Sequence, residues 1–89
     1  MDESHQSDPL RRARLRWRAR RGLLENDLIV TRFLDVNEEH MTDEEVDAFS
    51  RLMELSDNDL LNLFLARNEL QGEQDLPHVR AMLERLRRA

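Results

Sequence analysis

Arg21, Gly22 and Glu25 are spaced so that they could form a contact site, because together they make the pattern R-G-x-x-E. The arginine guanidinium offers planar, bidentate hydrogen bonds to carboxylates and phosphates. A glycine leaves room for a second backbone to approach, and it adopts the left-handed conformation more easily than other residues do. These residue types in this order suit recognition of another macromolecule. We call residues 21–25 the R-G-x-x-E segment.

An arginine-rich run precedes this segment. Residues 10–22 contain seven arginines and no acid, although the chain of 89 residues has a formal net charge of −5. All fourteen basic residues are arginine, which reflects either genomic base composition or a use for bidentate hydrogen bonding. Trp17, the only tryptophan, lies in this run. It is either a core residue or an interface anchor, since tryptophan and arginine are enriched in interface hot spots.

The R-G-x-x-E segment also has a structural interpretation. Gly22 is a natural helix stop, and Glu25 suits the first turn of a following helix. The side chain of Arg21 could pair with Glu25 or Asp27. Such contacts would hold the segment rigid and present its backbone to a partner, so the two interpretations are compatible.

Residues for other kinds of chemistry are sparse. An enzyme needs an activated nucleophile, an acid–base pair or a metal. The three histidines do not have the spacing of metal-ligand pairs, and the chain has no cysteine. The acidic run at 43–47 lacks the spacing of a calcium loop, and no glycine-rich phosphate loop is present. We therefore expect no catalytic residue, no metal site and no cofactor bound by the protein itself.

The composition predicts a small cytoplasmic protein. No apolar run approaches the roughly 20 residues that cross a bilayer. The acids among residues 1–8 argue against a secretory or mitochondrial leader. We expect residues 1–8 to form a flexible tail and residues 9–89 a single helical domain. We also expect a monomer without membrane insertion.

The periodicity predicts an all-α, compact five-helix bundle. Asp8 and Pro9 suit a helix start. Residues 12–20 alternate like a strand, but arginine, leucine and alanine favour helix and no partner strand is evident. Thr42 and Glu45 form a capping box before the third helix. Ser56 or Asp57 is expected to cap the fourth helix, and Asp75 the fifth.

The apolar positions indicate which faces are buried. The first helix would bury a narrow stripe, and the second a wide face. The third and fourth helices would each bury four or five side chains, and the fifth would bury four. These positions are, in chain order, Leu10, Ala13 and Trp17; Leu24, Leu28, Val30, Phe33, Leu34 and Val36; Val46, Phe49, Leu52, Met53 and Leu55; Leu60, Leu61, Phe64 and Leu65; and Val79, Met82, Leu83 and Leu86.

These features resemble the FAD assembly factors of succinate dehydrogenase, the bacterial SdhE family and its mitochondrial counterpart, succinate dehydrogenase assembly factor 2. The family pattern has an arginine and an aromatic residue before R-G-x-x-E and an acid soon after it. The matching residues here are Arg14, Trp17, Arg20, Arg21, Gly22, Glu25 and Asp27. The similarity extends over residues 13–86, through Phe33-Leu34, the capping box and Phe49 before Arg51-Leu52-Met53-Glu54. Leu23 replaces a common methionine.

The resemblance implies a function. Such a factor binds the flavoprotein subunit of succinate dehydrogenase, and in bacteria that of fumarate reductase, and promotes covalent attachment of FAD to a histidine of that subunit. Arg21, Gly22 and Glu25 would form the core of the contact. Arg14, Trp17, Arg20 and Asp27 would support it. The FAD would be carried by the partner.

Two other functions remain open, the first suggested by the residues and the second by a label that members of the similar family have carried. Residues 11–21 could bind nucleic acid, with arginines on phosphates and Trp17 stacked on a base. The acidic remainder of the chain and the absence of a known reading motif argue against this. An antitoxin-like regulator is the second alternative, and a membrane-associated toxin among co-purifying proteins would support it.

Overall fold

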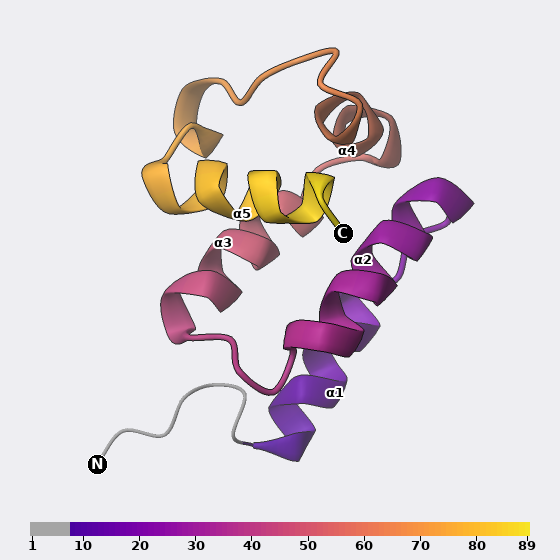
Figure 1. Cartoon of the computed structure of the whole chain (residues 1–89), viewed down its shortest axis with the longest axis vertical. Coiled ribbons are helices and arrows are strands. Elements are labelled where there is room, and N and C mark those ends of the chain that lie inside the picture. Colours follow the sequence, from indigo (N-terminus) through magenta and orange to yellow (C-terminus); the bar gives the residue numbers. More distant parts are fainter. Residues whose placement is uncertain (1–7) are drawn as a thin grey trace.

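The computed structural model describes residues 8–89, and Figure 1 shows the arrangement of its helices. Within those residues it has five α-helices, one short 3₁₀ turn and no strand. The predicted all-α five-helix fold is therefore confirmed. The elements are α1 (Pro9–Arg18), α2 (Leu24–Asn37), α3 (Asp43–Met53), α4 (Asp57–Phe64), the 3₁₀ turn η2 (Gly72–Gln74) and α5 (Pro77–Arg87).

Short-range capping explains three of the helix starts. The carboxylate of Asp8 accepts a hydrogen bond from the Leu10 amide at 2.9 Å. The predicted capping box is present, since Thr42 and Glu45 exchange hydrogen bonds of 2.8 and 3.1 Å. Ser56 caps α4. The prediction for Asp75 was wrong: the N-cap of α5 is Leu76, which provides no side-chain cap. The helix begins there because proline at the first helical position has no amide proton to satisfy.

Two helix pairs and α4 make up the bundle. In Figure 1, α1 runs behind α2, and the connection between them lies at the end of the pair beside α4. The guanidinium of Arg16 joins the two helices through hydrogen bonds of 2.8 Å to Asp35 and 2.9 Å to Glu38. Helices α3 and α5 pack against each other on the other side. A long connection, residues 65–76, then leads from α4 to α5 around the outside.

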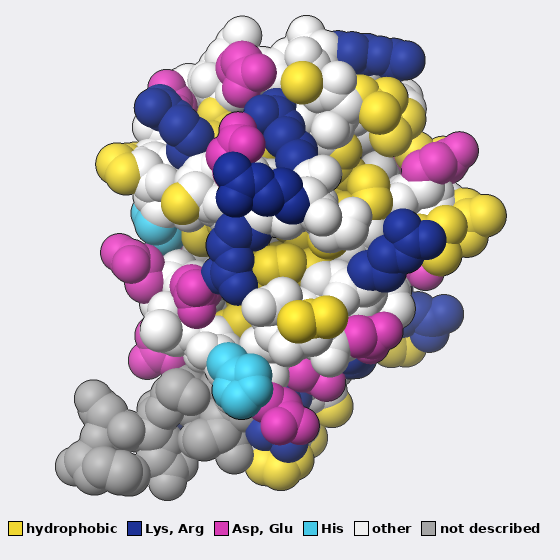
Figure 2. Space-filling view, in the orientation of Figure 1, with side chains coloured by type: hydrophobic (Ala, Val, Ile, Leu, Met, Phe, Trp, Pro, Cys, Tyr) yellow, Lys and Arg dark blue, Asp and Glu magenta, His cyan; other side chains and the backbone are white. Residues whose placement is uncertain are grey.

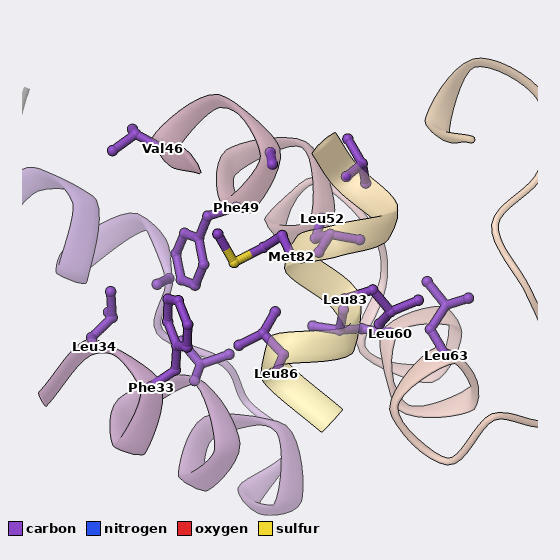
Figure 3. Close-up of a cluster of buried hydrophobic side chains, with 14 of the residues drawn as sticks. Phe33, Leu34, Val46, Phe49, Leu52, Leu60, Leu63, Met82, Leu83 and Leu86 are labelled. Atoms are coloured by element: carbon purple, nitrogen blue, oxygen red, sulfur yellow. The ribbon is translucent and has the colours of Figure 1, made fainter. Parts of the chain in front are cut away.

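The core lies between these two pairs and α4. Figure 3 shows the rings of Phe33 and Phe49 facing each other across α2 and α3, and their centroids are 5.9 Å apart. Side chains of α5 extend from this pair toward α4. All four apolar positions predicted for α5 are buried. The buried apolar set is Leu15, Ala19, Val30, Phe33, Leu34, Met41, Val46, Ala48, Phe49, Leu52, Leu60, Leu63, Phe64, Leu70, Val79, Met82, Leu83 and Leu86.

Several apolar residues predicted for the core are instead exposed. In α1 the buried side chain is Leu15, and Ala19 just after the helix is buried as well, so the predicted stripe is wrong. A helix at the surface of a small bundle buries a face roughly 100° wide. Apolar residues spread over a wider arc of α2 therefore cannot all point inward. In α4 Leu63 is buried, whereas Leu65, just after the helix, is exposed. The predicted core residues that are exposed are Leu10, Ala13, Trp17, Leu24, Leu28, Val36 and Leu65.

Two further sequence predictions concern the N-terminal tail and membrane insertion. The predicted tail, apart from Asp8, lies outside the described residues. Across residues 8–89, no helix is both long enough and apolar enough to cross a membrane.

Candidate functional site

The R-G-x-x-E segment forms the connection between α1 and α2. Helix α1 ends at Arg18, and the amide of its C-cap, Ala19, donates to the carbonyls of Leu15 and Arg16 at 3.0 and 3.2 Å. Gly22 is thus not the helix stop that the sequence predicted. Ala19 is buried in the core, so the chain leaves the helix from an anchored point. The segment therefore starts from a fixed position.

The side chain of Arg21 points into the protein, and only 9% of it is exposed. Its Nε donates to Asp57 Oδ1 at 2.8 Å, while Nη1 and Nη2 donate to the carbonyls of Met53 and Leu55 at 2.8 and 2.7 Å. Carbonyls at the end of a helix lack intrahelical partners. The guanidinium thus caps the end of α3 and ties it to the start of α4. The predicted pairing of this side chain with Glu25 or Asp27 was wrong. It is the backbone amide of Arg21 that donates to Asp27, at 3.1 Å.

Asp57 connects α4 to the segment through both carboxylate oxygens. Oδ1 accepts from Arg21, and Oδ2 accepts from the Leu23 amide at 3.1 Å. The buried Asn26 adds a bond from Nδ2 to the Asp57 carbonyl at 2.9 Å. The hydrogen bond from Arg21, followed by those from Asn26 and Leu23, holds the pKa of Asp57 below its usual value. Because the donors favour the ionised form, Asp57 carries a negative charge at neutral pH.

Gly22 lies at the surface of the segment. Its backbone is not in the left-handed region, which among the described glycines is adopted by Gly72, at φ +61°. A Cβ atom at Gly22 would lie 3.5 Å from Asp57 Oδ2, an ordinary contact distance. The structure therefore accommodates alanine there, and the need for a left-handed conformation that the sequence suggested is absent. A longer side chain would project from the exposed segment.

The other predicted site residues surround this segment at the surface. Trp17 is 71% exposed, and the guanidinium of Arg20 lies 5.7 Å from the centre of its ring. Arg14 and Glu25 are exposed as well. A shallow groove of about 300 Å³ separates α1 from α2 beside Trp17, and Asp27 contributes to its wall. The groove is lined by Arg16, Trp17, Ala19, Arg20, Asp27, Val30, Thr31 and Leu34.

The seven predicted residues thus fall into two groups. Arg21 and Asp27 make internal contacts that shape the segment, whereas Arg14, Trp17, Arg20, Gly22 and Glu25 are exposed. Trp17 is 71% exposed, so the interpretation of this residue as part of the core is wrong. An exposed aromatic ring among arginines has the composition of an interface hot spot.

Sequence reasoning missed Asn26 and the role of Asp57, which was considered only as a helix cap. One signal for Asn26 was available. It stands four and seven residues before Val30 and Phe33, so helical spacing places it on the buried face of α2. A polar residue at a buried position needs a hydrogen-bond partner. No local signal pointed to Asp57, because its contacts with the segment cross more than 30 residues of sequence.

The rest of the described surface does not suggest a metal or catalytic centre. No group of three or more histidine, aspartate or glutamate side chains in residues 8–89 is placed to hold a metal ion. Figure 2 shows acidic and basic side chains interspersed on the visible face, with separate apolar side chains between them. The R-G-x-x-E segment and its surroundings are therefore our candidate site.

This fold and site define a small helical protein that holds an arginine–glycine–glutamate loop at its surface by internal hydrogen bonds. Residues 13–89 match the family described as "Flavinator of succinate dehydrogenase", and the chain belongs to this family of FAD assembly factors. The family resemblance inferred from the sequence is confirmed.

The chain is similar to proteins named FAD assembly factor SdhE in several bacteria. It is 61% identical to the protein of Ralstonia nicotianae, over 94% of this chain and 88% of that protein. Identity is 34% with the Idiomarina loihiensis protein, over 83% and 82% of the two chains. It is 36% with the Acetobacter pasteurianus protein, over 88% and 74%. No solved structure matches the chain.

Proposed function

We propose that this protein is a monomeric, cytoplasmic assembly factor that binds the flavoprotein subunit of succinate dehydrogenase and promotes its covalent attachment of FAD. One observation carries the proposal: the R-G-x-x-E segment is fixed from inside by Arg21, and an exposed Trp17 and exposed arginines lie beside it. A rigid segment loses little conformational entropy when it binds. Family membership supports this choice of partner.

The surface that we assign to the contact consists of Arg14, Trp17, Arg20, Gly22 and Glu25. Within residues 8–89, neither Arg14 nor Arg20 forms an ion pair with a carboxylate of this chain. Their guanidinium groups are available for carboxylates of the partner, and the groove beside Trp17 offers apolar walls. We therefore propose that the contacted part of the flavoprotein subunit is acidic and carries an apolar side chain for this groove.

The proposed mechanism requires no catalytic group on the assembly factor. Attachment needs an arrangement of the flavoprotein in which the flavin and the acceptor histidine meet. A ligand shifts a conformational equilibrium by the difference in its affinity for the two states. An assembly factor that binds the competent arrangement more tightly would raise its population, while the FAD stays in the flavoprotein.

A pull-down from the native host tests this proposal. The tagged protein is captured, and the bound subunit is examined for covalent flavin by in-gel fluorescence, in cells with and without the gene. The same gel tests the flavoprotein subunit of fumarate reductase, to which the family resemblance also extends. Loss of covalent flavin in the deletion strain, together with capture of the subunit, would support the proposal. Normal flavin attachment without the gene would refute it.

Gly22→Arg tests the assigned surface. We expect this variant to fold, because Gly22 is exposed, and to capture the subunit poorly, because the added side chain prevents close approach. Ala81→Arg is the matched control, since it places the same side chain at an exposed position on α5. Equal capture by both variants would show that the R-G-x-x-E segment is not the contact.

A further inference from the structure

We propose that Asp57, which lies outside the R-G-x-x-E pattern, is a positioning residue for partner binding: it sets the shape of the segment through Arg21 and Leu23. This inference rests on the proposed function, because it specifies how the proposed contact surface is held. Asp57 would not touch the partner through its carboxylate. It would act through the backbone and side chain of the residues on either side of Gly22.

The hydrogen bonds of Asp57 place it on both sides of Gly22. Its Oδ1 holds the Arg21 side chain at 2.8 Å, and its Oδ2 holds the Leu23 amide at 3.1 Å. Gly22, the residue between them, has no side chain that could fix its position. One carboxylate, in the first turn of a different helix, thus contacts the residues on both sides of Gly22. Asp27 also holds the Arg21 amide, at 3.1 Å, but within the described residues the hydrogen bond that fixes the Leu23 amide comes from Asp57.

Asn26 fixes the position of Asp57, and with it the start of α4, relative to α2. Its side chain is fully buried, and Nδ2 donates to the Asp57 carbonyl at 2.9 Å and to the Asp57 carboxylate at 3.4 Å. Asn26 belongs to the first turn of α2, so its hydrogen bonds join the start of α2 to Asp57 at the start of α4. Asp57 is also the residue that holds Arg21 and Leu23. A shift of Asp57 would disturb Arg21, Leu23 and Asn26 together.

A second hydrogen bond, which does not involve the R-G-x-x-E segment, also holds α4 in place. At the other end of this helix, the Arg87 Nε donates to the Leu63 carbonyl at 2.8 Å. Arg87 thus ties α4 to α5 without contacting residues 21–25. A variant at Arg87 weakens the attachment of α4 but leaves the restraint on Gly22 intact. The two positions allow a local effect on the segment to be separated from a general loss of stability.

The test compares Asp57→Asn with Asp59→Asn. Both variants remove one negative charge from the first turn of α4, but the Asp59 side chain is exposed and, within residues 8–89, forms no hydrogen bond or ion pair with the segment. In Asp57→Asn the new amide group must face either the Arg21 Nε–H or the Leu23 N–H, so a donor opposes a donor. If the competent shape of the segment falls to about a tenth of the population, the Kd for the flavoprotein subunit rises about tenfold. Asp59→Asn should bind like the wild type.

Amide hydrogen exchange on the isolated protein provides the readout that a purely structural role would not give. We expect exchange at Leu23 to accelerate about tenfold or more in Asp57→Asn while core amides such as that of Phe49 stay protected, because local opening is independent of global unfolding. Arg87→Ala is the destabilised control. It should reduce the melting temperature without changing exchange at Leu23 or affinity in the folded state.

The outcomes distinguish this inference from the proposed function. If the wild type fails to bind the subunit, the proposed function is wrong, and exchange at Leu23 still tests the restraint. If the wild type binds and Asp57→Asn binds equally well, or if exchange at Leu23 is unchanged, the inference about Asp57 is overturned. A loss of affinity in Arg87→Ala as large as that in Asp57→Asn would also overturn it, because stability alone would then explain both.

Discussion

Replacing Arg21 by alanine should destabilise the protein far more than its place in a surface connection suggests. The guanidinium makes three hydrogen bonds, to Asp57 and to the carbonyls of Met53 and Leu55. Only 9% of the Arg21 side chain is exposed. A hydrogen bond contributes about 1 kcal/mol net, and roughly 1.5–3 kcal/mol when a charged group is involved. Water will enter the vacated space and restore part of this loss.

We therefore expect a decrease of about 3 kcal/mol in the free energy of unfolding, near the lower end of the roughly 3–5 kcal/mol for breaking a buried ion pair. A chain of this length has a total stability of about 4–13 kcal/mol. The melting temperature should fall by roughly 12–24 °C, since each kcal/mol shifts it by about 4–8 °C in a domain of this size.

Urea and thermal unfolding followed by circular dichroism provide the assay. Arg20→Ala is the matched control, because it removes the same side chain from the neighbouring, exposed position. The control should stay within about 0.5 kcal/mol of the wild type, as surface substitutions usually do. If Arg21→Ala and Arg20→Ala had the same midpoint as the wild type, the guanidinium would not be the internal support that its hydrogen bonds indicate.

Two further predictions concern the N-cap of α3 and the stability of the protein at low pH. Thr42→Ala should lower the free energy of unfolding by about 1 kcal/mol, because the hydroxyl caps α3; urea titration checks this against Thr31→Ala, at an exposed mid-helix position, and equal losses would contradict it. The lowered pKa of Asp57 means that its contribution to stability is complete above its unfolded pKa of about 4 and is lost as the pH falls through its folded value. Unfolding free energies measured from pH 6 down to pH 2 should therefore fall more steeply for the wild type than for Asp57→Asn, and parallel curves would be inconsistent with this assignment.

The extent of each buried face was the least predictable part of the fold from sequence. Leu24 and Leu28 have the same residue type and spacing as buried leucines, yet both are exposed. A hydrophobic pattern shows which side chains are apolar. It does not show whether another helix of the same chain or a separate molecule covers them. The pattern also predicted Leu65 for the core, but α4 ends at Phe64, Leu65 is exposed and Leu63 is buried.

The amino-acid sequence alone determined the features that depend on near neighbours. The caps at Asp8, Thr42 and Ser56 each involve an amide within three residues, and helical periodicity spans only a few turns. The family pattern around Gly22 is local as well, so the R-G-x-x-E segment could be recognised before its geometry was known.

Only the tertiary structure decided the direction of the Arg21 side chain. Its acceptors at Met53, Leu55 and Asp57 lie 32 to 36 residues further along the chain. They meet the guanidinium because the end of α3 and the start of α4 fold against the connection between α1 and α2. Local sequence offered nearer acids, Glu25 and Asp27, but a buried guanidinium requires several acceptors in different directions, and packing of distant helices supplied them.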